Sequence, residues 1–536
     1  MKIIAKFAYS QVYMIKYIVL GLSLLTAVAC TGNGKKKERQ TVNTAKVAEP
    51  LVDTSLLVLD TLMIDSFLVN KPAFKEFKED FRTFYAARNF RYAWFDTKGI
   101  IEGAQHLAGQ IRARENDGVI KKQAYADEFF TLIDQQKAKP LKPLLALELM
   151  LTAQYFSYSK NRLGGSELTK AKDLGWYLQA KKLSYAQLLA KQLKSPSSEI
   201  EQEAVIPQYI ALRKMLNHYQ ELEKKEKDVW VDNDTLFKKI SVGDTLVALA
   251  KLRERLLQLG DLKIKAPDSV YDQPLADAIV RFKKRHGIRA DFSISQGFLK
   301  EINVPLHSRI QQMMINLERM RWIPLGDHGA KFILVNIPAY QLYYYENNKL
   351  SWGCKVVVGK AMNQTVIFEG NLQYIVFSPY WYVPESIIKK EILPAMKNNP
   401  AYLDRHRMEW NDGKVRQKPG ADNSLGLVKF IFPNVNDIYL HDTPSKPLFK
   451  EDVRAFSHGC IRVEKPKELA ALLLPKWTSK NIDAAMKGGK EQWIPLKSKV
   501  PVYIGYFTAY VDSAGELNFR DDVYQRDGRL LEMLMQ

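Results

Sequence analysis

The sequence is poor in cysteine and histidine, which limits the metal sites that it can form. It has 3 cysteines and 8 histidines among 536 residues. No two cysteines stand at CxxC spacing, and no HExxH motif is present. The sequence therefore has no pattern typical of a zinc site. We expect neither a bound metal nor another cofactor.

The N-terminal region has an apolar run, but the run is short. Residues 18–29 are apolar, follow Lys16 and end directly before Cys30. A membrane-spanning helix needs about 20 apolar residues, whereas this run has the length of a signal-peptide core. The small residues 27–29 before Cys30 resemble the lipobox of bacterial lipoproteins, whose cysteine is lipidated. An ordinary signal peptide or an uncleaved anchor are the alternatives. In each case we expect export to the cell envelope, in the periplasm, with Cys30 as the lipid anchor in the first.

The chain is basic, with 79 Lys and Arg against 59 Asp and Glu and a net charge of +20. A basic surface favours an anionic partner. Nucleic acid is not expected for an exported protein, so wall polymer and membrane head groups are the candidate anions. A solvated, lysine-rich surface without a partner is the alternative.

The pattern of apolar residues predicts an α+β protein. Helical spacing is found in residues 144–158 and 208–222, and then in 246–259, 275–286 and 310–322. From Lys331 the period changes to two. The strands we expect are 332–337, 341–346, 350–358, 372–377, 428–432 and 438–441, interrupted by helices at 385–398 and 465–474.

These patterns divide the chain into six predicted segments. They are a signal peptide (1–29), a flexible tether (30–50), a helical scaffold (51–245), a second helical unit (246–325), a β-rich domain (326–510) and a charged C-terminal tail with some strand character (511–536).

The residues with the clearest chemistry lie in the β-rich domain. Cys460 stands in the run Ser-His-Gly-Cys, and His441 follows Tyr-Leu 19 residues earlier. A cysteine that transfers acyl groups needs a base to remove its proton and donors for the developing oxyanion. We predict Cys460 as nucleophile, His441 as base, and the N–H groups of Gly459 and Cys460 as oxyanion donors. The side chain of Asp442, or a nearby backbone carbonyl, would orient His441.

Two alternatives remain open at this site. His458 shares a face with Cys460 on an extended backbone and is a rival base. Arg462 can bind a substrate carboxylate or form a structural ion pair. Because Cys460 must stay free, we expect Cys354 to be a lone buried strand residue.

Ser-His-Gly-Cys after Tyr-Leu-His at this distance resembles the signature of the L,D-transpeptidase catalytic domain. Further runs in this sequence resemble the large, scaffold-bearing members of that family. These runs are Val356 to Lys360 before Thr365, Phe377 to Trp381, Leu425 to Phe430, Arg454 to Ser457, Asn316 to Arg319, and Arg321 with Trp322.

The resemblance implies roles for individual residues. Cys460 matches the nucleophile, His441 the base and Gly459 the oxyanion turn, and His458 matches a flanking active-site residue. The residues that the resemblance places near substrate are Tyr439, Arg462, Ser457 and Trp381. The family reaction attacks a stem tetrapeptide, releases D-Ala, and passes the acyl group to a side-chain amine of a second stem, which gives a 3→3 cross-link.

Two further segments also resemble the large members. Residues 379–426 are similar in place to their helical lid, which would exclude water. Residues 246–305 resemble a peptidoglycan-binding domain, although a purely structural role is equally compatible with the sequence. The same acyl-enzyme also serves an L,D-carboxypeptidase or the attachment of a wall protein. A wall-binding lipoprotein without catalysis is the rival from a different class.

Overall fold

The structure is a computed structural model that describes residues 57–139, 142–165, 172, 175–177, 183–194, 205–232, 240–264, 269–323, 331–347 and 349–535. The predicted signal peptide (1–29) and the whole predicted tether (30–50), with the lipidation site Cys30, lie outside the described residues. Among the helices that are described, none is long and apolar enough to cross a membrane.

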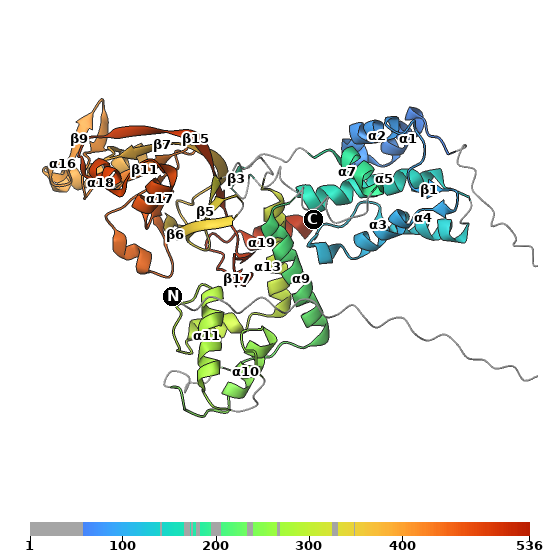
Figure 1. The fold of residues 1–536 in the computed structure, drawn as a ribbon, viewed down its shortest axis with the longest axis horizontal. Helices are drawn as coiled ribbons and strands as arrows, with labels where there is room; N and C mark the ends of the chain where they lie inside the picture. The colour runs from blue at the N-terminus through green and yellow to red at the C-terminus, as the bar shows by residue number, and fades with distance from the viewer. Residues whose placement is uncertain are drawn as a thin grey trace, which may run out of the picture. The chain divides into compact units, whose positions relative to one another are not determined.

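The first part of the described chain is helical, as predicted, and has its own core (Figure 1, blue to cyan). α5 (Leu145–Ser159) is buried on nearly all sides, which fits a helix with apolar residues around its whole axis. Its Glu148 is fully buried and accepts hydrogen bonds from Tyr85 Oη and from the N–H groups of Ala93 and Trp94. The other elements are α1 (Thr61–Asn70), η2 (Pro72–Phe77), α2 (Lys78–Ala86), β1 (Phe95–Asp96), β2 (Gly99–Ile100), α3 (Glu102–Arg112), η3 (Arg114–Asp117), α4 (Ala126–Ala138), η4 (Lys160–Gly164) and α7 (Tyr185–Lys194).

A second, smaller core gathers α10 (Leu249–Gln258), α11 (Gln273–Arg285) and α12 (Gln296–Ile302). The Asp272 carboxylate accepts from Leu275 N at 2.9 Å and so caps the start of α11. Gly287, just beyond its end, has a φ of +69°, as expected for a helix stop. The helices predicted at 246–259 and 275–286 are therefore confirmed.

Two longer helices, α9 (Pro207–Lys225) and α13 (Leu306–Arg321), pack on each other and belong to the main core. α9 lies in the predicted scaffold segment (51–245) and α13 in the predicted second helical unit (246–325). The structure buries apolar residues of both helices, including Leu216 and Met313, in the same core as the strands. Each of these helices has an apolar face that the rest of its predicted segment does not cover, and this face packs against the main core.

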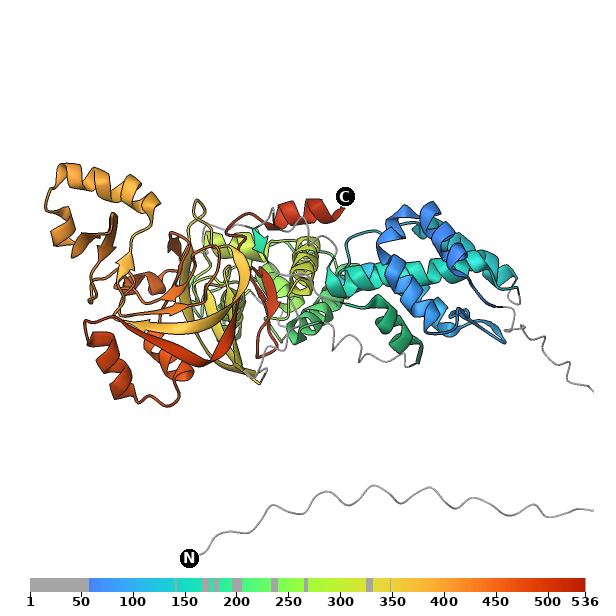
Figure 2. The same cartoon turned by 90° about the horizontal axis from the view of Figure 1, so that it is seen from above.

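The main sheet has the strand order β11-β12-β14-β6-β5-β4-β15-β7-β3, and β7 also pairs with β11. The pairing path therefore closes on itself, and its long strands appear as curved ribbons in Figure 2. The strands are β3 (Trp176–Tyr177), β4 (Lys331–Asn336), β5 (Gln341–Glu346), β6 (Lys349–Gly359), β7 (Ile367–Phe377), β11 (Val428–Ile431), β12 (Leu440–His441), β14 (Ile461–Val463) and β15 (Gln492–Gly505), and β13 (Ala455–Ser457) pairs with β6. The six predicted strands are confirmed, and with the helical regions they confirm the α+β class; β15 was not predicted.

The segment predicted as a helical lid has a small core of its own and contains strands as well as helices (Figure 2, orange). A three-stranded sheet of order β8-β10-β9 forms because Asp412 and Gly413, both at positive φ, close a tight hairpin. The lid elements are β8 (Trp381–Tyr382), α14 (Glu385–Ile387), η7 (Ile388–Ile392, a π-helix), α15 (Leu393–Asn398), α16 (Tyr402–Arg405), β9 (Met408–Asn411) and β10 (Lys414–Gln417).

A short 3₁₀ helix, η8 (Lys446–Lys450), lies near β6. The remaining elements pack on the main core and are α17 (Pro466–Leu473), α18 (Ser479–Lys487), β16 (Ala509–Val511), β17 (Leu517–Phe519) and α19 (Asp527–Met535). Phe519, Leu530 and Leu534 are buried in that core. The prediction of strand character after residue 510 is confirmed, and the structure adds the helix α19, whose buried Leu530 and Leu534 attach this charged segment to the main core.

Candidate active site

Strand register brings four predicted site residues to one face of the main sheet. β12 and β14 are parallel, with His441 opposite Arg462, and Ile461 N donates to Tyr439 O at 3.1 Å. Tyr439 therefore lies across from Cys460, two residues before the His441–Arg462 pair. Side chains two residues apart share a face, and paired residues point the same way. Tyr439, His441, Cys460 and Arg462 form one group, which we call the catalytic face.

The catalytic face is the side of the sheet that looks away from the main core. The intervening residues Leu440, Ile461 and Val463 point to the other side and are buried in that core. Their burial fixes the register, because a slip of one residue would bring polar side chains into the core. The core thus determines which side chains of β12 and β14 remain available for chemistry.

Cys460 is a free thiol in a partly buried position. Its Sγ lies 3.6 Å from the carbonyl oxygen of Asp437, and the Tyr439 side chain also hydrogen-bonds it. Burial raises the pKa of the Cys460 thiol, while the Tyr439 contacts and the charge of Arg462 act in the opposite direction. The resting residue is therefore a neutral thiol that needs a base before it can attack.

His441 is buried and held by one short hydrogen bond. Its Nδ1 lies 2.5 Å from the carbonyl oxygen of Asp442. Because that oxygen only accepts, Nδ1 carries the proton and Nε2 keeps its lone pair. Burial, followed by the charge of Arg462, lowers the pKa of His441 to about 3. The imidazole is thus neutral at pH 7, which is the state that a general base requires.

Of the two orienting partners that we considered, the structure favours the carbonyl. The Asp442 carboxylate is engaged elsewhere: it accepts from Leu427 N at 2.9 Å and from Lys446 Nζ at 2.5 Å. Gly426 lies so close that a Cβ there would meet this carboxylate at 2.4 Å. Asp442 therefore connects the C-terminal root of the lid to the backbone carbonyl that orients His441.

The rival base, His458, is directed to the lid. Its Nε2 lies 3.1 Å from Glu391 Oε1 in η7, and its side chain is 41% exposed. Gly459, at a φ of +122°, breaks the extended backbone that would place His458 on the face of Cys460. His441 shares the catalytic face with Cys460 and His458 contacts the lid, and the assignment of His441 as the base stays a prediction.

The turn before Cys460 corrects the prediction about oxyanion donors. Gly459 N–H donates to Ser457 Oγ at 3.1 Å, and Ser457 Oγ donates to Cys460 O at 2.5 Å. Thr365 Oγ1 donates to Gly459 O at 2.8 Å. Gly459 N–H is thus already engaged, and Cys460 N–H is the one of the two predicted donors that has no partner within the described residues. Ser457 supports the turn, its predicted contact with substrate stays a prediction, and the role of Thr365 was not predicted.

Arg462 does not form the ion pair that we considered as an alternative. No carboxylate of the described chain pairs with it, and its buried Nε has no hydrogen-bond partner there. Burial lowers the pKa of Arg462, while the nearby Cys460 raises it. An unpaired guanidinium beside the nucleophile is well placed for an anionic ligand.

The remaining predicted residues lie elsewhere. Trp381 is in β8 and packs against the lid core, so the structure does not bring it into the catalytic face. Cys354 is a buried free cysteine of β6, as expected, and burial raises its pKa to about 12.

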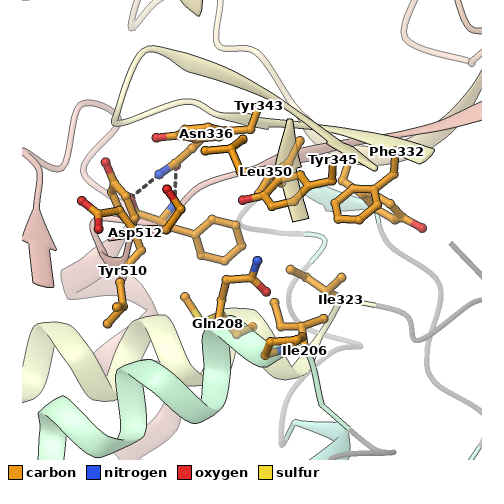
Figure 3. Close-up of a pocket in the computed structure, with 17 residues that line it drawn as sticks. Ile206, Gln208, Ile323, Phe332, Asn336, Tyr343, Tyr345, Leu350, Tyr510 and Asp512 are labelled. Carbon is orange, nitrogen blue, oxygen red and sulfur yellow. Dashed lines mark hydrogen bonds between the residues drawn. The ribbon is translucent and has the colours of Figure 1, made fainter. Parts of the chain in front are cut away.

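An apolar cavity of about 110 Å³ lies outside this site (Figure 3). The rings of Phe332, Tyr343 and Tyr345 on the strands face Ile206 and Gln208 at the start of α9. None of the predicted site residues lines it. The chemistry of the chain is therefore concentrated on the catalytic face rather than in this cavity.

Comparison with known proteins matches the part of the chain that contains the catalytic face. Residues 330–502 match the L,D-transpeptidase catalytic domain, and residues 79–216 match a scaffold domain. A protein of Haemophilus influenzae named "Putative L,D-transpeptidase" is 34% identical over 243 residues, which cover 41% of this chain. The match covers 49% of that relative, so the chain spans about half the length of the curated protein that it matches.

Solved structures give only a weak likeness. An L,D-transpeptidase from Stackebrandtia nassauensis is 16% identical with a TM-score of 0.20, and the alignment covers 51% of this chain and 95% of that one. An L,D-transpeptidase from Mycobacterium smegmatis is 10% identical with a TM-score of 0.20, and the alignment covers 33% of this chain and 58% of that one. These scores are too low to support an argument. The sequence matches therefore give this chain an L,D-transpeptidase catalytic domain at residues 330–502 and a scaffold domain at residues 79–216.

Proposed function

We propose that this protein is a peptidoglycan L,D-transpeptidase that forms 3→3 cross-links through a thioester on Cys460, with release of D-Ala. The observation that carries this proposal is the catalytic face itself. A thiol, a neutral imidazole and a guanidinium point the same way from two neighbouring strands, and within the described residues neither the imidazole Nε2 nor the guanidinium has a partner.

In the first half of the proposed reaction, His441 Nε2 accepts the thiol proton as Sγ attacks the carbonyl carbon before the terminal D-Ala. The oxyanion that forms can accept a hydrogen bond from Cys460 N–H. The imidazolium then gives its proton to the leaving amine, and D-Ala departs. Arg462 binds a carboxylate of the donor stem and so fixes its position against the sulfur.

In the second half, a side-chain amine of another stem attacks the thioester, and the thiol is regenerated. Water can react with the same thioester, which would make the enzyme an L,D-carboxypeptidase, and an amine on a wall protein would attach that protein. The lid favours the amine, because its Glu391 contacts His458 in the turn before Cys460 and a lid held there limits the access of water.

We also propose that the protein works at the envelope, attached to a membrane by a lipid on Cys30. The support is the sequence before that residue, an apolar run that ends in small residues. Labelling of cells with a radioactive fatty acid tests this: wild type should be labelled and Cys30→Ala should not. Label on the variant, or none on wild type, would contradict the anchor.

Mass spectrometry of the intact protein tests the enzymatic proposal. Incubation with tetrapeptide muropeptides, or with a carbapenem, should add one acyl group to wild type and to Cys354→Ala, and none to Cys460→Ala. Cys354→Ala is the matched control, because it removes a buried free cysteine outside the site. If wild type forms no adduct, the chain is not this enzyme and the wall-binding lipoprotein becomes the better reading.

A further inference from the structure

Asp437 is an acidic residue beside a nucleophile that has to become an anion. Its carbonyl oxygen is 3.6 Å from Cys460 Sγ, and its side chain is exposed. Its carboxylate has no hydrogen bond or ion pair within the described residues. In a chain with 79 basic residues, an unpaired acid at this position needs an explanation.

The loop that holds Asp437 is firmly built. Asn434 Oδ1 accepts from the N–H groups of Asn436 and Ile438, at 3.0 and 3.2 Å. Asn434 Nδ2 donates to the carbonyls of Phe432 and Ile438, both at 2.7 Å. Asp437 itself has a φ of +51°, a left-handed conformation that costs energy for a residue other than glycine. The loop thus maintains a strained residue next to the sulfur.

The charge of Asp437 opposes the first half of the proposed reaction. It raises the pKa of Cys460 and, with Cys460, that of Tyr439. A nearby negative charge disfavours the thiolate and so slows acylation. Any benefit must therefore come from the second half, when the sulfur is a neutral thioester and the incoming nucleophile is an amine.

We propose that the carboxylate of Asp437 binds the protonated side-chain amine of the acceptor and so favours cross-linking over hydrolysis. This inference rests on the proposed function. An aliphatic amine is an ammonium ion at neutral pH, and a carboxylate beside the thioester concentrates that cation where water would otherwise react. Asp437 thus provides an acceptor subsite, whereas Arg462 faces the donor.

The proton balance of this step is complete. The bound ammonium loses one proton to His441 Nε2, and the amine nitrogen attacks the thioester carbon. The new C–N bond forms as the C–S bond breaks and sulfur leaves as a thiolate. The imidazolium returns its proton to that sulfur, and the second proton of the nitrogen passes to solvent, leaving an amide and a free thiol.

The test compares the fates of the acyl-enzyme in Asp437→Asn and wild type. With tetrapeptide muropeptides, the variant should acylate at least as fast as wild type, while the ratio of cross-linked dimer to hydrolysed tripeptide falls by about fivefold. Hydroxylamine, a nucleophile that is uncharged at neutral pH, should resolve both acyl-enzymes equally well. Asp437→Glu should restore part of the ratio.

The matched control is Asp452→Asn, which also removes one exposed negative charge, from the segment that leads to β13. It should leave the product ratio within about twofold of wild type. An unchanged ratio in Asp437→Asn, or an equal fall in Asp452→Asn, would overturn the acceptor subsite. Absence of any adduct on wild type would instead overturn the proposed function, so the two failures are distinguishable.

Discussion

Arg462 acts on the catalytic base through its charge. After burial, this guanidinium is the largest cause of the low pKa of His441, about 3. No carboxylate of the described chain neutralises it. In the proposed reaction, a donor carboxylate that binds Arg462 cancels its field, so the imidazole becomes a stronger base only when substrate is present. Binding and activation are then a single event.

The variant Arg462→Gln tests this coupling. Removing the cation raises the pKa of His441, and the base must be neutral to act. The acidic limb of the acylation rate should therefore move to higher pH, by about one pH unit, and the maximal rate should fall because the donor loses its carboxylate contact. Mass spectrometry measures the second-order rate of carbapenem acylation between about pH 2 and pH 8, a range that includes the acidic limb of wild type near the pKa of His441, about 3.

Lys446→Gln is the control for this pH profile. Lys446 also lowers the pKa of His441, but it is the weaker cause and is already paired with Asp442. Its removal should shift the acidic limb of the pH–rate profile to higher pH as well, but by less than Arg462→Gln does. Equal shifts in both variants would show that Arg462 has no special place beside the base.

At the residue scale, much of the site follows from the sequence. Tyr439 shares a face with His441, and Cys460 shares a face with Arg462, because the members of each pair are two residues apart on extended backbone. That spacing can be read from the sequence, and the pairing of β12 with β14 then brings the two pairs together. The engaged N–H of Gly459 and the proximity of Asp437 do not follow from spacing. Both depend on how turns bend back, and a turn can place a side chain in several directions.

At the element scale, the lid is attached to the site through the C-terminal end of its segment, at Gly426. Gly426 has a φ of +61° and lies against the Asp442 carboxylate, whose backbone carbonyl orients His441. The N-terminal root is held by Glu491, which accepts from Tyr380 N at 3.0 Å. A change at Gly426 therefore reaches the base without touching substrate.

Gly426→Ala should damage both stability and activity. Its Cβ would lie 2.4 Å from the carboxylate carbon, so Asp442 must move, and alanine is also strained at this φ. We expect the free energy of unfolding to fall by about 3 kcal/mol, of which 1–2 kcal/mol is backbone strain, and acylation to slow by about tenfold. Urea unfolding and the adduct rate measure the two effects.

Gly413→Ala provides the comparison within the same lid. Its φ is +74°, but a Cβ there meets nothing within 4 Å. This variant should lose about 1 kcal/mol from strain alone and keep its acylation rate. If both variants behave alike, the contact between Gly426 and Asp442 has no role in positioning His441.

The elements that sequence patterns missed have identifiable causes. β15 contains Pro495 and Pro501, which argue against a central strand, and its register shifts between Pro495 and Val500. The lid strands β9 and β10 are short, although the Asp-Gly pair between them is a strong hairpin signal. β4, β5 and β6 were predicted well, because a clear change of period marks them.

At the scale of the whole molecule, α9 and α13 tie the helical parts of the chain to the catalytic domain. α13 ends in Arg321, whose guanidinium donates to the carbonyls of Asp117 and Gly118 at 2.6 and 2.9 Å. Trp322 follows, fully buried, with its ring 5.0 Å from that of Trp176, which itself adds a strand to β7. The boundary that sequence patterns place at residue 326 therefore cuts through a core instead of a linker.

The two boundaries predict different behaviour for truncated chains. Residues 326–536 alone would expose the sheet surface that α9 and α13 cover, and each large apolar side chain lost from that core costs about 1.5–3 kcal/mol. The sum exceeds the 5–15 kcal/mol by which domains are stable, so this chain should show no cooperative urea transition. Residues 205–536 retain both helices and should unfold cooperatively, at a lower midpoint than the full chain because Trp176 is missing. Circular dichroism measures the urea unfolding of each truncated chain. A cooperative transition for residues 326–536 would show that the catalytic sheet needs neither helix.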